Sequence, residues 1–117
     1  MESNFNIRWT RQPRGSTRPS FIGLGHEMGH IQDVWNKTFD SSIWSGSVTN
    51  AEKYATHIEN QLRSEHGIPL RAYYGKTIIG AGDPATQILS TGTRASLFYK
   101  KTVTIRNISI STTPYIY

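Results

Sequence analysis

The chain has 117 residues and a net charge of +5, and 36% of its residues are hydrophobic. This size and composition are typical of one small globular domain, which we assign to residues 1–117. Cysteine is absent, which excludes disulfides, thiolate metal sites and cysteine nucleophiles. No apolar run approaches the roughly 20 residues of a membrane helix, so we expect no membrane span.

The charge is distributed unevenly along the chain. All eight acidic residues lie at or before Asp83, and the first 18 residues carry four arginines against one acid. A basic surface of this kind attracts acidic partners. Aromatic and basic residues do not interleave as they do in nucleic-acid-binding modules, so no specific nucleic acid partner is expected.

The first half of the chain predicts a strand followed by a helix. Residues 5–10 alternate polar and apolar side chains, which predicts a half-buried strand. A loop with proline and glycine over residues 11–19 leads into a helix predicted over residues 19–35. That helix contains three glycines, each costing up to about 1 kcal/mol relative to alanine. We therefore expect another segment to approach its backbone closely.

A second helix is predicted over residues 49–66, after a loop over residues 36–48. Thr49 and Glu52 match a capping box, and Gly67 marks the end of the helix. One face carries an apolar stripe made of Ala51, Ala55, Ile58 and Leu62.

Beyond residue 70, short apolar runs predict strands. They cover residues 77–79, 87–89, 96–99 and 102–110, and an irregularity at Asn107 is interpreted as a bulge. The predicted class is therefore α+β, with two helices and a small antiparallel sheet.

Residues 26–30, His-Glu-Met-Gly-His, match the H-E-x-x-H motif on the first predicted helix. Because residues advance about 100° each, His26 and His30 lie about 40° apart and can both bind one metal ion. Glu27 lies about 100° from His26, which suits it to act on a metal-bound water. Zn²⁺ acidifies such a water, so the motif predicts zinc as cofactor and Glu27 as general base.

A zinc site of this kind needs a third protein ligand. The third histidine of the longer motif is absent, because Asn36 occupies its position. Glu52 and Glu59 lie about 20° apart on the second helix. Glu52 is the preferred ligand although a capping role also explains it, and Glu59 is the alternative. We expect the other one to support a ligand. Asp33 is placed either to orient a ligand imidazole or to lie in solvent near the end of the helix.

Residues around the second helix complete the expected site. Arg71 and Tyr74, with Tyr73 as the alternate, are candidates for stabilising an oxyanion, although a strand with packed aromatic residues also fits this segment. His57 is predicted to lie at the surface. His66 is predicted to end the helix rather than to bind the metal.

Three stretches of the sequence resemble the NleD-like effector metallopeptidases, a group that includes peptidase toxin domains at the C-termini of Rhs-type polymorphic toxins. They are LGHEMGH at residues 24–30, AEKYATHIENQLR at 51–63 and GIPLRAYYG at 67–75. The resemblance spans residues 22–75, about half of the chain.

The resemblance implies a zincin fold and a bacterial effector or toxin that cleaves proteins inside a target cell. It implies zinc on His26 and His30, with Glu27 as base. A looser similarity to clostridial neurotoxin light chains implies Glu52 as third ligand, with an Arg-x-x-Tyr pair near the zinc. The resemblance also implies a protein substrate and secretion or delivery into a target cell, and it admits a cognate immunity or inhibitor protein.

The sequence thus predicts a zinc metalloendopeptidase and leaves two other functions open. One is a zinc hydrolase of a non-protein amide, such as a cell-wall peptide. The other is a basic nucleic-acid-binding module, in which the H-E-x-x-H motif is incidental and its histidines are structural.

Overall fold

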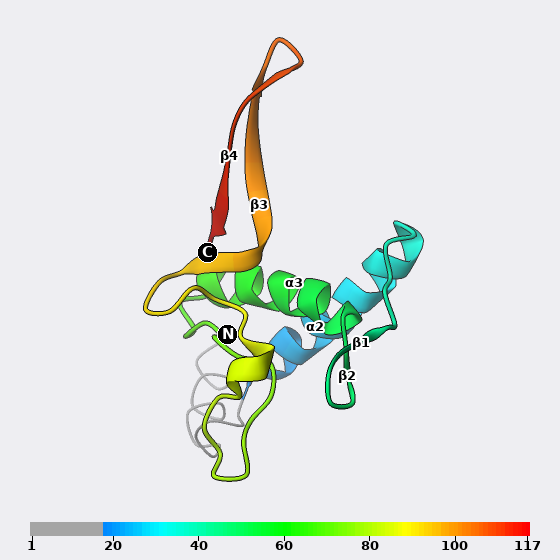
Figure 1. Ribbon diagram of the computed structural model, residues 1–117, viewed down its shortest axis with the longest axis vertical. Helices are drawn as coiled ribbons and strands as arrows, with labels where there is room; N and C mark the ends of the chain where they lie inside the picture. The colour runs from blue at the N-terminus through cyan, green and yellow to red at the C-terminus, as the bar shows by residue number, and fades with distance from the viewer. Residues whose placement is uncertain (1–17) are drawn as a thin grey trace, which may run out of the picture.

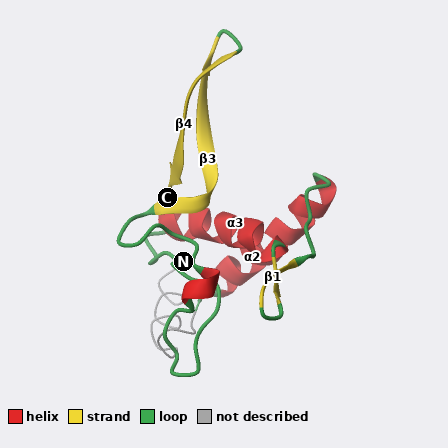
Figure 2. Ribbon diagram, in the orientation of Figure 1, coloured by secondary structure: helices red, strands yellow, loops and turns green. Residues whose placement is uncertain are grey.

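The computed structural model describes residues 18–117, so the strand predicted over residues 5–10 lies outside the described residues. Two helices and two small antiparallel sheets form this part of the chain, which confirms the α+β class (Figures 1 and 2). None of its helices is both long and apolar enough to cross a membrane. In chain order the elements are α2 (Ser20–Trp35), β1 (Ile43–Ser45), β2 (Val48–Thr49), α3 (Ala51–Glu65), the short 3₁₀ helix η1 (Pro84–Thr86), β3 (Ala95–Ile105) and β4 (Ile108–Ile116).

Helices α2 and α3 pack directly against each other (Figure 1). Ile22 of α2 and Ala55 of α3 are both completely buried. A Cβ atom on Gly29 would lie 3.1 Å from the Cα atom of Ala55, and one on Gly25 would collide with the side chain of Leu62. The expected close approach to the glycine-containing helix is therefore confirmed, and α3 is the segment that makes it.

The N-terminus of α3 differs from the predicted capping box. The N-cap is Asn50, and no side chain caps the first turn. The prediction is wrong because Thr49 belongs to strand β2, and because the Glu52 carboxylate turns towards the histidines of α2. The helix ends as predicted: Gly67 follows it with φ of +67°, a conformation that favours glycine.

Two predicted strands do not form. Residues 77–79 make a turn that the Gly80 N–H closes by donating to the Thr77 carbonyl at 2.9 Å. Ile78 and Ile79 are exposed there, so these apolar residues do not mark a buried strand. Residues 87–89 contribute only isolated bridges, at Gln87 and Leu89. The loop predicted over residues 36–48 in turn contains β1 and the start of β2.

Strands β3 and β4 form a long hairpin that projects away from the helices (Figure 1). Its turn lies at Arg106 and Asn107, whose φ angles are 53° and 65°. Two successive left-handed residues are typical of the tight turn between antiparallel strands. The single strand predicted over residues 102–110, with a bulge at Asn107, is therefore wrong, because the chain reverses there.

His57 is buried, so its predicted surface position is also wrong. The hairpin covers its side of α3: the Tyr99 ring stacks on His57 at 4.3 Å, and the Tyr115 ring meets it edge-on at 4.9 Å. The Gln61 amide donates to Nε2 at 2.9 Å, and Nδ1 pairs with the Tyr117 hydroxyl. Burial lowers the pKa of His57 to about 4.

Another part of the α3 surface buries polar groups. Glu59, Asn60 and Thr56 have no exposed surface. Buried polar side chains are costly unless they find hydrogen-bonding partners. One partner of Glu59, His26, belongs to the candidate site.

Candidate metal centre

Helices α2 and α3 bring three potential metal ligands together. His26 and His30 lie one turn apart on α2, and Glu52 reaches them from the first turn of α3. The Nε2 atoms of His26 and His30 lie 2.9 and 3.2 Å from Oε1 of Glu52. All three ligand atoms lie within 4.8 Å of one another, so this group could hold a metal ion.

The hydrogen bonds of His26 fit a cation between Nε2 and Glu52. Nδ1 of His26 lies 2.8 Å from Oε1 of Glu59, so both ring nitrogens face carboxylates. A neutral imidazole carries one N–H. If that proton is donated to Glu59, Nε2 presents a lone pair to Glu52, and a proton or a metal must join them. In a tetrahedral zinc site with bonds of about 2 Å, ligand atoms lie roughly 3.3 Å apart, close to the observed separations.

Glu59 contacts His26 on the side of the ring opposite Glu52. Its Oε1 atom also forms ion pairs with Arg18 and Arg71, each at 2.9 Å. Its Oε2 atom forms an ion pair with Arg63 at 2.8 Å. Burial by itself would raise the pKa of Glu59. The hydrogen bond from His26 and the charges of Arg71 and Arg63 outweigh burial and lower that pKa to about 2. Glu59 therefore stays ionised and favours the His26 tautomer with Nε2 free for a metal.

The structure separates the roles of the three acids considered for this site. Glu52 lies on the Nε2 side of His26, where the metal would bind, and Glu59 lies on the Nδ1 side. Asp33 does not orient His26: it is buried farther along α2 and accepts a hydrogen bond from the Thr38 hydroxyl. Nδ1 of His30 has no hydrogen-bonding partner within residues 18–117, so His26 is the better supported ring.

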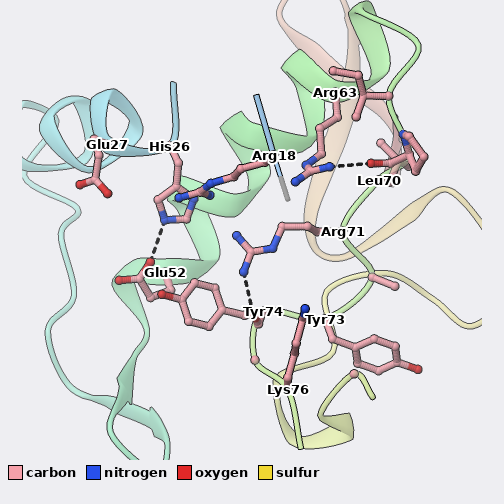
Figure 3. A pocket seen from close by; sticks show the side chains of 15 residues that line it. Arg18, His26, Glu27, Glu52, Arg63, Leu70, Arg71, Tyr73, Tyr74 and Lys76 are labelled. Carbon is pink, nitrogen blue, oxygen red and sulfur yellow. Dashed lines mark hydrogen bonds and ion pairs between the residues drawn. The ribbon is translucent and has the colours of Figure 1, made fainter. Parts of the chain in front are cut away.

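A pocket of about 770 Å³ is lined by two of the three candidate ligands, His26 and Glu52 (Figure 3). Glu27 lines it from α2 and is exposed to solvent. Tyr74 also lines the pocket, and its ring centre lies 6.2 Å from that of His26. Burial, followed by the charge and hydrogen bonding of Glu52, raises the pKa of Tyr74, so its hydroxyl remains a donor. Tyr73 points away from Glu52 (Figure 3).

The Arg71 guanidinium is fixed at the wall of this pocket. Nη1 pairs with Glu59, Nη2 donates to the Tyr74 carbonyl at 2.6 Å, and Cζ lies 4.8 Å from the centre of the Tyr74 ring. The Asn60 side chain exchanges two hydrogen bonds with the Arg71 backbone, at 2.8 and 3.1 Å. A role for Arg71 on an oxyanion would use its remaining N–H groups.

Three residues of the site had no role in the sequence analysis. Arg63 lies four residues after Glu59, and this spacing could have predicted their ion pair. Asn60 falls within a stretch that carries the family resemblance, but the spacing gives it no role. Nothing in the sequence links Arg18 to Glu59, 41 residues away.

The fold and the site define a small α+β protein with a candidate His-His-Glu metal centre. Comparisons of the chain with protein-family models, with curated proteins and with solved structures found no match. The functional proposal therefore rests on the geometry of the site and on the sequence motif.

Proposed function

We propose that this protein is a zinc metallopeptidase with a minimal zincin-like fold. One observation carries the proposal: the Nε2 atoms of His26 and His30 both face a single carboxylate oxygen of Glu52. The spacing of the H-E-x-x-H motif supports zinc as the metal. The resemblance to NleD-like peptidases supports an effector or toxin that cleaves target-cell proteins after secretion or delivery.

The residues around the centre have distinct roles in this proposal. His26, His30 and Glu52 would hold zinc, which when bound supplies Lewis-acid chemistry for hydrolysis of an amide. Glu27 would accept a proton from the attacking water and return it to the leaving amine. Tyr74 would donate its hydroxyl hydrogen bond to the substrate oxygen as negative charge develops, with Arg71 adjacent.

Metal content tests the first part of this proposal. The purified chain should bind one zinc per molecule. Glu52→Gln should weaken zinc binding at least about tenfold, since even residues that only support a ligand cost that much. Glu65→Gln is the matched control, because Glu65 is an exposed acid on the same helix. A wild-type chain without zinc, or equal affinity in the Glu52 variant, would refute the metal site.

Turnover tests the second part. Glu27→Gln should keep zinc and lower hydrolysis of a peptide mixture by about 10²- to 10⁴-fold, because the general base is lost. Mass spectrometry of the products would locate the cleaved bonds. If the wild-type chain binds zinc but cleaves no peptide, the result would support the metal site and contradict the peptidase activity.

A further inference from the structure

Three guanidinium groups surround one carboxylate beside the candidate metal centre. Arg18, Arg63 and Arg71 all pair with Glu59 at 2.8 to 2.9 Å. Three positive charges against one negative charge leave a surplus of two at the edge of the pocket. Positive charge that is partly removed from water favours the binding of an anion.

Arg18 is the member of this group that can best contact a second anion. Oε1 of Glu59 faces three donors, from Arg18, Arg71 and His26, whereas a carboxylate oxygen has two lone pairs. The Arg18 side chain is 33% exposed, compared with 23% for Arg71 and 9% for Arg63. Arg18 can therefore turn towards a ligand while Glu59 keeps its other partners.

The surplus charge lies where a substrate would bind. Arg18 and Arg71 line the same pocket as Glu27, and Figure 3 shows their side chains next to the His26 ring. Among the described residues that line this pocket, Glu27 and Glu52 are the acids. In the proposed function, zinc would bring two positive charges against these two carboxylates, so the surplus of the arginines would remain.

We propose that this part of the pocket is a carboxylate-binding subsite that selects peptide substrates with an acidic group near the scissile bond. Arg18 would make the contact through paired N–H groups, and Arg71 would add the second positive charge. The carboxylate could come from an Asp or Glu side chain or from the C-terminus of a peptide. This inference deepens the proposed function and rests on it.

Direct binding tests the subsite without turnover. The probes are short, fluorescently labelled, alanine-rich peptides that carry a single Asp, Asn or Lys, each with a free or an amidated C-terminus. The Glu27→Gln chain with zinc should bind the Asp peptide about tenfold or more tightly than the Asn peptide, and the Lys peptide most weakly. A preference that follows the free C-terminus would identify the terminal carboxylate as the ligand.

Charge variants identify the contact. In the Glu27→Gln background, Arg18→Gln should abolish the preference for Asp over Asn, and Arg18→Lys should restore part of it. Lys101→Gln, which removes an exposed charge from the hairpin, should leave the preference intact. Equal binding of the Asp and Asn peptides, with zinc bound, would overturn the subsite alone. An Asp preference in a wild-type chain that binds no zinc would keep the subsite and would instead overturn the proposed function.

Discussion

Helix α3 buries two polar clusters that differ in charge. In the ionic cluster, Glu59 remains ionised with a pKa of about 2, and in the aromatic cluster, His57 remains neutral with a pKa of about 4. Burial opposes the charged form of both residues, but only Glu59 has opposite charges in contact. The ionic cluster comprises Glu59, Arg18, Arg63, Arg71 and His26, and the aromatic cluster comprises His57, Tyr54, Tyr99, Tyr115 and Tyr117.

The two clusters also serve different parts of the molecule. The ionic cluster orients His26 and fixes Arg71 at the pocket. The aromatic cluster attaches the base of the β3–β4 hairpin to α3, through Tyr99 of β3 and Tyr115 of β4. The comparison teaches that a buried titratable side chain on one helix can be charged or neutral, depending on which groups the neighbouring segments place against it.

Removing Glu59 should have the largest effect on stability. Glu59→Ala leaves three buried or half-buried arginines without their shared partner, so we expect the free energy of unfolding to fall by about 3–5 kcal/mol. Urea denaturation measures it, with Glu65→Ala as the exposed control, expected within about 0.5 kcal/mol of wild type. A loss below about 1 kcal/mol for Glu59→Ala would contradict the ionic cluster.

The aromatic cluster should make stability depend on pH. His57 has a lowered pKa in the folded chain, about 4 against 6.5, so the unfolded chain binds its proton first as the pH falls. The contribution of His57 is therefore complete above pH 6.5 and is lost between pH 6.5 and 4, by up to about 1.4 kcal/mol per pH unit. Urea denaturation across this range should show a shallower slope for His57→Gln. Equal slopes would mean that His57 titrates alike in both states.

The tip of the hairpin should matter least. Ile108 is 64% exposed, beyond the contacts that the aromatic cluster makes at the base of the hairpin. Ile108→Thr keeps a β-branched residue in the strand, so we expect the free energy of unfolding to change by no more than about 0.5 kcal/mol. A loss above about 1 kcal/mol, measured by urea denaturation, would show that the tip packs against something.

Sequence patterns correctly predicted the elements that are stabilised mainly by residues close to one another along the chain. Both helices begin and end within about two residues of the predicted positions. The strand over residues 77–79 failed because Ile78 and Ile79 are apolar without being buried. The turn at Asn107 was mistaken for a bulge because Arg106 is an unusual residue at positive φ, so no standard turn signal was present.

By itself, the sequence determined that His26 and His30 share one face of a helix, because their spacing fixes their directions. It preferred Glu52 but kept Glu59 as the alternative, because the two face almost the same direction although they lie about 10.5 Å apart along the helix axis. The crossing of α2 over α3 places Glu52 between two imidazoles and Glu59 behind one of them, which favours Glu52 as the candidate ligand. The docking of the hairpin likewise decided the burial of His57, because only distant segments supply its cover.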